Sequence, residues 1–414
     1  MRLFLFLFFS ILLTLESLPV YSQGKQLNYK PSILVDSLIS VEIKDTLKVM
    51  RLIEKALAED QNNPDLIYYR GYLNFSSHKY TLAIFDLDKV LLQFPDNYTA
   101  LITKGNIYRE MGKSDLALSN YEKATQTTDT ASVAYVDKGD LEIELNRLVD
   151  ALKDLKIAAR IRPSYTQMLH LGLGYEAMNQ YDSAIACYKK ALIFKPKGGD
   201  ALNNLGTCFT VLRKYQEAVD YFTATISAGY GFSDVFYNRG NAYRLLTRYP
   251  DAIKDFDVAI KLDPEDAKAH NDRGFCEENL KQMDLAEIDF SLAIKYRPNY
   301  SLALCNRGIL RTQKGMNKEA LEDFNEAIKC NKANLVAYRN RGCLRKNTGD
   351  LNGGIDDFSF VLEKVPSDCD SYLNRAQTYY MMKNIKMACK DLEAAKRFDS
   401  CQETAKGLLL QICK

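Results

Sequence analysis

A small residue recurs along the chain at an almost constant spacing, and this regularity limits the possible folds more than any other feature. Of the nine intervals between these positions, eight are 34 residues long and one is 33. Self-similarity at a period of about 20–50 residues is typical of arrays in which each repeat packs only on its neighbours. The length of 414 residues therefore does not predict separate globular domains. The positions are Gly71, Gly105, Gly139, Gly172, Gly206, Gly240, Gly274, Gly308, Gly342 and Ala376.

Three other positions keep the same period. A second small residue, usually alanine, follows each of these positions by 12 residues, and a large apolar residue follows after 4 more. Seven repeats place alanine three residues further on, and proline closes six of them. Proline lacks an N–H group and disfavours helical geometry in the residue before it, so it predicts the end of a helix. Those prolines are Pro95, Pro163, Pro196, Pro264, Pro298 and Pro366.

The spacing predicts two helices in every repeat. Around Gly240, Phe236 and Tyr243 fall on the same face of a first helix, and Ala252 and Phe256 share a face of a second. A polar turn is expected between them, at about 247–250. Glycine inside a helix costs about 1 kcal/mol relative to alanine, so nine glycines at one phase need a packing reason. We expect glycine and alanine to let the two backbones approach, with the aromatic ring filling the wider gap beside them.

The unit YNRGNAYRLLTRYPDAIKDFDVAIKLDP, residues 237–264, resembles the tetratricopeptide repeat. The resemblance implies an all-α fold, a right-handed superhelix of stacked antiparallel helix pairs whose first helices line a concave groove. Ten units fit without long insertions. Numbered one to ten, they span residues 64–97, 98–131, 132–164, 165–198, 199–232, 233–266, 267–300, 301–334, 335–368 and 369–402.

The two ends of the chain depart from the period. A terminal repeat cannot bury its apolar face alone, so arrays need caps. We expect a linker and an N-terminal capping helix in residues 23–63, and a C-terminal cap in residues 403–414.

The first 22 residues read as a secretory signal peptide. Arg2 precedes an apolar stretch from Leu3 to Leu15, Pro19 ends it, and Ser22 precedes the expected cleavage point. The stretch is shorter than the ~20 apolar residues of a membrane span. We therefore expect an exported protein without a membrane span after cleavage, periplasmic or secreted in a bacterial host, or alternatively in a secretory lumen.

Export would allow the ten cysteines to form disulfides, because oxidising compartments favour them. Seven lie after residue 300, none forms a CxxC pair, and no histidine lies near them in sequence, which argues against a zinc site. Two interpretations stay open. Most of these cysteines could be small buried apolar residues of helices, or Cys369 and Cys401 could form a disulfide that closes the last helical hairpin.

The resemblance implies that the groove binds an extended peptide or a partner's helix. On the expected exposed side of the first helices, the fifth and ninth residues of the repeats include tyrosine, asparagine, arginine and cysteine, and the sixth residue is asparagine in five repeats. Asparagine can both donate to and accept from a peptide backbone; the alternative is that these amides bond neighbouring helices within the framework. The candidate groove residues are Tyr68, Tyr72, Asn106, Asn203, Tyr237, Asn241, Asn271, Asn306, Arg339 and Asn340.

Other functions find little support in the sequence. The net charge of +2 gives no basic stripe for nucleic acid. Paired carboxylates such as Asp255–Asp257 and Asp356–Asp357 are expected on solvated faces of second helices. The three histidines are scattered without a matching nucleophile, so we expect neither an enzyme nor a cofactor. The recurring arginines at the phase of Arg239 are expected to pack their stems between helices.

The sequence thus predicts an exported, non-catalytic scaffold for protein–protein interaction, acting in envelope assembly or secretion. Two alternatives stay open: a co-chaperone of the secretory lumen that holds unfolded chains, and a groove that binds a glycan or small molecule. The oligomeric state and the identity of the partner are not predicted.

Overall fold

The computed structural model describes residues 46–128 and 130–413, which form 22 α-helices and no strand. Adjacent helices stack as pairs, so the predicted all-α solenoid is confirmed. The expected signal peptide, residues 1–22, lies outside the described residues, as does the expected linker up to residue 45. The first described helix, α3, lies within the segment where an N-terminal capping helix is expected.

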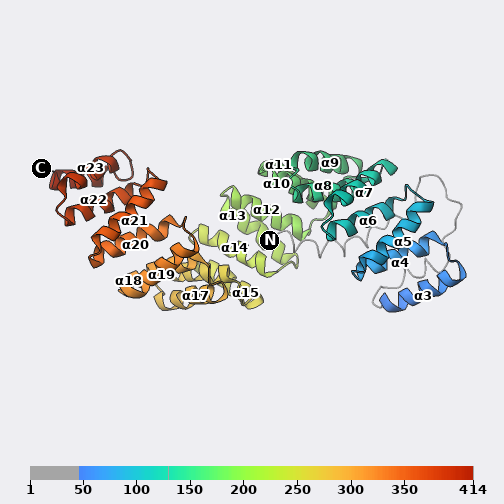
Figure 1. Ribbon diagram of the computed structural model, residues 1–414, viewed down its shortest axis with the longest axis horizontal. Helices are drawn as coiled ribbons and strands as arrows, with labels where there is room; N and C mark the ends of the chain where they lie inside the picture. Colours follow the sequence, from blue (N-terminus) through green and yellow to red (C-terminus); the bar gives the residue numbers. More distant parts are fainter. Residues whose placement is uncertain (1–45, 129, 414) are drawn as a thin grey trace. The chain divides into compact units, whose positions relative to one another are not determined.

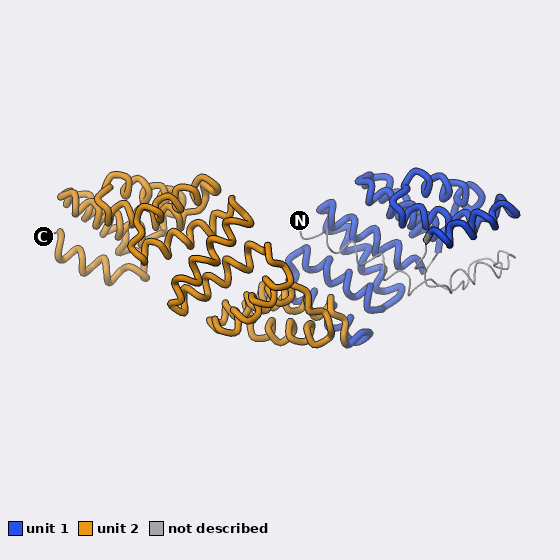
Figure 2. The backbone as a smooth tube through the Cα atoms, turned by 90° about the horizontal axis from the view of Figure 1, so that it is seen from below, with its two compact units in different colours: residues 1–196 blue, residues 197–414 orange. Residues whose placement is uncertain are grey.

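The helices divide into two compact units, of which the first ends at Pro196 and the second begins at Lys197 (Figure 2). In each unit, successive helices along the chain are also neighbours in space (Figure 1). Unit 1 contains α3 (Thr46–Glu59), α4 (Pro64–Ser76), α5 (Tyr80–Gln93), α6 (Tyr98–Glu110), α7 (Ser114–Thr127), α8 (Ser132–Glu144), α9 (Leu148–Ile161), α10 (Tyr165–Ala177) and α11 (Tyr181–Phe194). Unit 2 contains α12 (Gly199–Val211), α13 (Tyr215–Ser227), α14 (Ser233–Leu245), α15 (Tyr249–Leu262), α16 (Ala267–Asn279), α17 (Met283–Tyr296), α18 (Ser301–Gln313), α19 (Asn317–Cys330), α20 (Leu335–Thr348), α21 (Leu351–Lys364), α22 (Cys369–Met381), α23 (Ile385–Ala395) and α24 (Gln402–Ile412).

The turn inside each repeat contains one residue with a left-handed backbone, always at the same place in the period. Its φ ranges from 57° to 96°. This conformation cannot continue a right-handed helix, and for a residue other than glycine it costs about 1–2 kcal/mol. The turn therefore stops the first helix at a fixed length. The residues are His78, Gly112, Asn146, Asn179, Arg213, Thr247, Lys281, Gly315, Gly349 and Lys383.

Proline acts at both ends of the second helices. α15 ends at Leu262, two residues before Pro264, and the other five closing prolines stand in the same relation to their helices. The predicted turn at 247–250 is shorter than expected, because Tyr249 and Pro250 already belong to α15. Proline is tolerated in the first turn of a helix, where its missing N–H would have no partner in any case.

Seven of the nine periodic glycines make room for an aromatic ring, and Gly71 and Gly139 face leucines instead, which corrects the predicted packing. A Cβ atom added to Gly105 would lie 2.4 Å from the ring of Tyr121, and one added to Gly240 would lie 2.9 Å from that of Phe256. The ring thus lies over the glycine rather than in a gap beside it. Seven such rings are fully buried: Tyr121, Tyr188, Phe222, Phe256, Phe290, Phe324 and Phe358.

The recurring arginines do more than pack their stems. Arg239 donates from Nε and Nη2 to both oxygens of Asp255, at 2.8 and 2.7 Å. Asp255 is only 4% exposed and Asp357 only 3%, so the expectation of a solvated face is wrong for these two carboxylates, whereas Asp257 and Asp356 are exposed. A buried carboxylate requires a partner, and the guanidinium fork supplies it. The same two-point contact joins Arg70–Asp86, Arg239–Asp255, Arg273–Asp289, Arg307–Asp323, Arg341–Asp357 and Arg375–Asp391.

In unit 2 each of these arginines also reaches back to the preceding second helix. Arg273 Nη1 donates to Asp257 Oδ1 at 2.7 Å, and Arg307 Nη1 donates to Ser291 Oγ at 3.1 Å. One guanidinium therefore connects two successive second helices, which fixes the spacing from repeat to repeat.

Candidate functional site

Successive first helices contact one another, which places them on one side of the stack in each unit. α8 contacts α10 in unit 1, and α14 contacts α16 in unit 2; successive second helices of the described chain make no contact of this extent. The first helices therefore approach one another more closely than the second helices do. This is the arrangement expected of the inner side of a curved stack.

Hydrogen bonds between side chains 35 residues apart run along this side, from one first helix to the next. The distances are 3.2 Å for Tyr68–Thr103, 2.8 Å for Tyr237–Asp272 and 3.0 Å for Asn271–Asn306. Arg109 and Glu144 make the same connection through two bonds. We call this side of each unit its ladder face, defined in unit 1 by Tyr68, Thr103, Arg109 and Glu144 and in unit 2 by Tyr237, Asp272, Asn271, Asn306, Glu278 and Gln313.

Several candidate groove residues are members of this framework. Tyr237 donates to the Asp272 carboxylate, and burial together with that negative charge raises the pKa of its hydroxyl. Asn271 is 1% exposed and accepts from Asn306, so its amide does not face the open surface. Asn106 accepts from the Tyr121 hydroxyl at 2.5 Å. These groups hold one helix against another.

The other candidates are held within their own helix or in ion pairs. Asn241 accepts from Arg244, and Asn340 donates to the carbonyl of Val336 at 2.8 Å in the same helix. Arg339 lies 3.1 Å from a carboxylate oxygen of Asp368. Tyr72 is half-buried.

Asn203 and its neighbour Asn204 differ from these candidates. Within the part of the chain that the structure describes, Asn203 Oδ1 is buried without a donor and Asn204 Nδ2 is buried without an acceptor. Asn203 as a whole is half-buried, whereas Asn204 is 7% exposed. A buried polar atom without a partner is uncommon and requires an explanation. Both residues belong to α12, at the start of unit 2.

Charged side chains gather on the first helices of repeats two to four, which the sequence reasoning missed. His170 lies 2.8 Å from Asp140; burial opposes protonation of its ring, but the Asp140 carboxylate outweighs burial and raises the pKa of His170. Burial and the nearby Asp140 charge raise the pKa of Asp137 to about 7. Arg109 and Glu144 complete the group. No periodic signal marks these residues, because each occurs in one repeat only.

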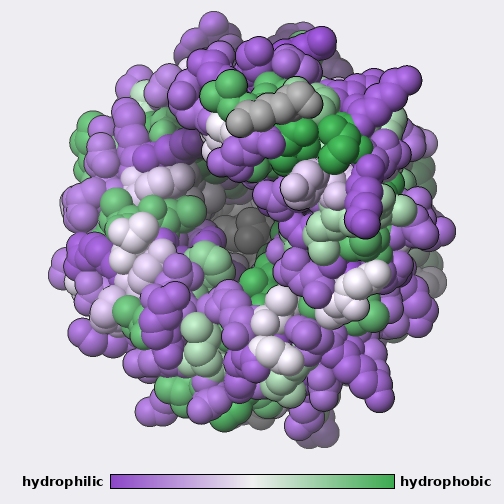
Figure 3. All heavy atoms as spheres, turned by 90° about the vertical axis from the view of Figure 1, so that its left-hand side faces the viewer, coloured by the Kyte–Doolittle hydropathy of each residue, from purple (hydrophilic) through white to green (hydrophobic). Residues whose placement is uncertain are grey.

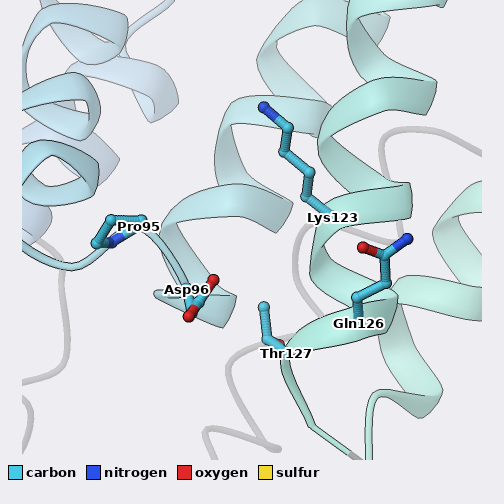
Figure 4. A pocket seen from close by; sticks show the side chains of 5 residues that line it. All are labelled: Pro95, Asp96, Lys123, Gln126 and Thr127. Carbon is cyan, nitrogen blue, oxygen red and sulfur yellow. The ribbon is translucent and has the colours of Figure 1, made fainter.

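A pocket of unit 1 lies away from all of these residues. It is lined by Pro95 and Asp96 from the loop after α5, and by Lys123, Gln126 and Thr127, which project from α7 (Figure 4). None of the candidate groove residues contributes to its lining. The pocket therefore adds nothing to the candidate site.

Two disulfides close the C-terminal end of unit 2. One joins Cys369 to Cys401, the pair singled out in the sequence, and the other joins Cys389 to Cys413. Cys369, Asp370 and Cys401 come close enough together to suggest a metal site, but both sulfurs are committed to the disulfide. In the described residues, no helix combines the length and apolarity that crossing a membrane requires.

Stacked helix pairs with a fixed period define the chain as an α-helical solenoid. Models of the tetratricopeptide repeat match residues 98–128, 169–231 and 234–276. The chain therefore contains tetratricopeptide repeats in these stretches.

Relatives share the fold at low sequence identity. The chain is 27% identical over 169 residues to BBSome complex member BBS4 of Bos taurus, covering 41% of this chain and 33% of that one. It is 29% identical over 164 residues to the peroxisomal targeting signal receptor of Komagataella phaffii, covering 37% and 28%. The chain thus spans about a third of the length of these curated relatives. The APC/C hetero-tetramer Cut9–Hcn1 superposes with a TM-score of 0.52 at 13% identity over 92% of this chain and 95% of that one, which shows the fold alone.

Proposed function

We propose that the chain is an exported, non-catalytic scaffold that binds an extended peptide segment of a partner protein on the ladder face. The observation that carries this proposal is the amide oxygen of the half-buried Asn203 on α12, which has no donor among the described residues. An extended peptide presents an N–H donor and a C=O acceptor on its main chain. Asn203 is half-buried, so a rotation of its side chain would bring Oδ1 to the surface, where the peptide N–H group would donate to it.

The surrounding ladder face explains why binding would concentrate there. Elsewhere, the side chains that could engage a peptide already bond one another, as Tyr237 does with Asp272 and Asn306 with Asn271. Breaking such a bond would cancel most of the gain from a new one, because a hydrogen bond contributes only about 0.5–1.5 kcal/mol net. Asn203 Oδ1 has no bond to lose.

Export is supported by the apolar N-terminal segment and by the two disulfides at the C-terminal end. Disulfides persist in oxidising compartments and are rare in a reducing cytosol. One relative is by name a receptor for a targeting signal, which agrees with peptide recognition. We infer a role in envelope assembly or secretion.

A peptide-display experiment tests this function. The protein from Gln23 onward is exposed to a library of random peptides, and the bound peptides are remade with single main-chain esters that remove one N–H donor. We expect Asn203→Ala, and at least one ester, to weaken binding about tenfold, the loss of one hydrogen bond. Asn340→Ala is the matched control, because its amide already bonds Val336.

Two results would count against the proposal. Equal binding by wild type and Asn203→Ala would move recognition to another surface. Uniform tolerance of all esters would show that side chains, and not the main chain, are recognised.

A further inference from the structure

The last helix of the chain, α24, is attached at both ends by disulfides. Cys401 is the residue just before α24 and Cys413 the residue just after it. Cys401 is joined to Cys369, the first residue of α22, and Cys413 is joined to Cys389 within α23. Both disulfides therefore join α24 to the hairpin of α22 and α23, which it covers.

Packing holds α24 far less firmly than it holds the other helices. Ala405 is its only buried residue, whereas α20 buries Ala337, Gly342 and Leu344. Leu410 is 72% exposed. A helix of 11 residues is unstable alone in water, because isolated helices shorter than about 12–15 residues are marginal. The disulfides must therefore supply much of what keeps α24 folded and in place.

The two disulfides differ in access to solvent. Cys369 and Cys401 are 7% and 4% exposed, whereas Cys389 and Cys413 are both half-buried. Reduction begins with attack by an external thiolate on a disulfide sulfur, so a more accessible sulfur reacts sooner. Cys389–Cys413 is therefore the first to open. Its opening frees the C-terminal end of α24 while Cys401 still holds the other end.

We propose that α24 is a redox-releasable cap, opened in two ordered steps by a dithiol reductant. In each step the two thiols of the reductant lose two electrons and two protons and form a disulfide. The protein S–S bond breaks and takes up those electrons and protons as two cysteine thiols. The first step opens Cys389–Cys413 and loosens the end of α24; the second opens Cys369–Cys401 and detaches the helix.

Detachment would uncover apolar surface at the end of unit 2. α23 contacts α24 and carries Ala395 in its last turn, which is fully buried in the capped form. Figure 3 faces the side with the C-terminal repeats, where hydrophilic residues predominate and hydrophobic ones form separate areas. Losing the cap would add new apolar area there.

Graded reduction of the full mature chain tests the proposal. The protein is titrated with dithiothreitol, each disulfide is followed by alkylation and mass spectrometry, and amide exchange is measured separately for residues 402–407 and 408–412. We expect Cys389–Cys413 to open at lower dithiol concentration, with exchange rising at least about tenfold in residues 408–412 only. Opening of the second disulfide should extend that rise to residues 402–407.

Variants keep the test interpretable if reduction disturbs other cysteines. Cys389→Ser with Cys413→Ser should reproduce the first step without reductant, and Cys276→Ser, at a buried free thiol, should change nothing in α24. Exchange in α14–α18 serves as the control for an intact array. Simultaneous opening of both disulfides, or unchanged exchange in α24 after both have opened, would overturn the proposal.

Discussion

In unit 2, arginines of the first helices bind aspartates of the second helices through two hydrogen bonds, whereas among the described residues of unit 1 only Arg70 makes this contact. Five consecutive repeats of unit 2 carry the two-point contact to a buried aspartate, and each arginine also reaches the preceding second helix. In unit 1 the same position holds Arg70, Lys104, Lys138 and then Leu171. Lys138 bonds Asp154 and Glu122, but an ammonium group lacks the planar fork that grips two carboxylate oxygens together.

Unit 1 has instead a local cluster of charged side chains on two of its first helices, α8 and α10. Asp137, Asp140 and His170 lie together there, and Asp137 has no hydrogen-bond partner among the described residues. A repeated framework and a local cluster thus occupy different parts of one array. Regular charges serve spacing in unit 2, whereas irregular charges give unit 1 a surface that differs from repeat to repeat.

The largest expected effect comes from breaking one arginine contact in unit 2. Asp289→Ala leaves Arg273 without its buried partner and should lower the free energy of unfolding by about 3–5 kcal/mol. Urea unfolding, followed by amide exchange in α16 and α17, measures the loss. Asp257→Ala removes a carboxylate that contacts the same arginine but has a 54% exposed side chain, and should cost less than about 1 kcal/mol.

The same change in unit 1 should be milder. Asp154→Ala removes one contact of the Lys138 ammonium group rather than a two-point contact of a guanidinium, so we expect a loss of about 1–2 kcal/mol. Equal losses for Asp154→Ala and Asp289→Ala would remove the proposed difference between the units.

The charge cluster of unit 1 should make stability depend on pH. The pKa of Asp137 is raised from 3.8 to about 7 in the folded state, so the folded state binds this proton more tightly than the unfolded state does. The stabilisation is complete below about pH 4 and disappears as the pH rises through 7. Between pH 5 and pH 8, wild type should lose about 1–3 kcal/mol more stability than Asp137→Asn. Urea midpoints at the two pH values measure the difference, and parallel pH curves would contradict it.

Unit 2 provides a matched control at another position. Burial and nearby Asp289 raise the pKa of Glu277 to about 7 as well. Glu277→Gln should therefore reduce a comparable loss of stability between pH 5 and pH 8 in α16 and α17. The pH response of α8 should stay unchanged.

Glycine substitutions sharpen the comparison of the two cores. A Cβ atom at Gly105 would lie 2.4 Å from the Tyr121 ring, against 3.0 Å between Gly274 and the Phe290 ring. Overpacking costs about 1–3 kcal/mol, and alanine returns about 1 kcal/mol of helix propensity. Gly105→Ala should thus destabilise by about 1–2 kcal/mol, with Gly274→Ala close to neutral. Thermal unfolding compares them, and Gly407→Ala in open space should not destabilise.

The smallest effects are expected on the ladder face. Tyr237→Phe removes a hydrogen bond to a carboxylate and should cost about 1 kcal/mol. Tyr68→Phe should cost less, because Thr103 keeps its bond to the Thr99 carbonyl. Calorimetry of both variants compares the two losses of stability. A larger loss for Tyr68→Phe than for Tyr237→Phe would show that the negative charge of the Asp272 carboxylate does not decide the strength of these hydrogen bonds.

Period and residue type predict the fold well, because both follow from packing between neighbours. The glycine phase and the closing prolines predict helix pairs, and α14 and α15 match them apart from Pro250. Burial of Asp255 could not be inferred from the helical pattern of its own helix. Its partner Arg239 lies 16 residues away, on the first helix.

The candidate site was harder to predict, since exposure on one helix depends on its neighbours. Asn271 has the right helical phase for a groove, but Asn306 of the next repeat covers it. The unsatisfied pair at Asn203 and Asn204 shows only when every neighbouring atom is placed. Cys389–Cys413 was missed because neither cysteine opens or closes a helical hairpin.

The arginine contacts also bear on how such a chain can lengthen during evolution. Each of the five arginines of unit 2 that make the two-point contact meets acceptors 16 residues before and 16 residues after itself. An in-frame duplication of one 34-residue period upstream of Cys369 would give every copied arginine the same acceptors at the same distances. A duplication that begins after Cys369 would separate or multiply the cysteines of the two disulfides. New repeats can therefore enter the array from within but not at its C-terminal end.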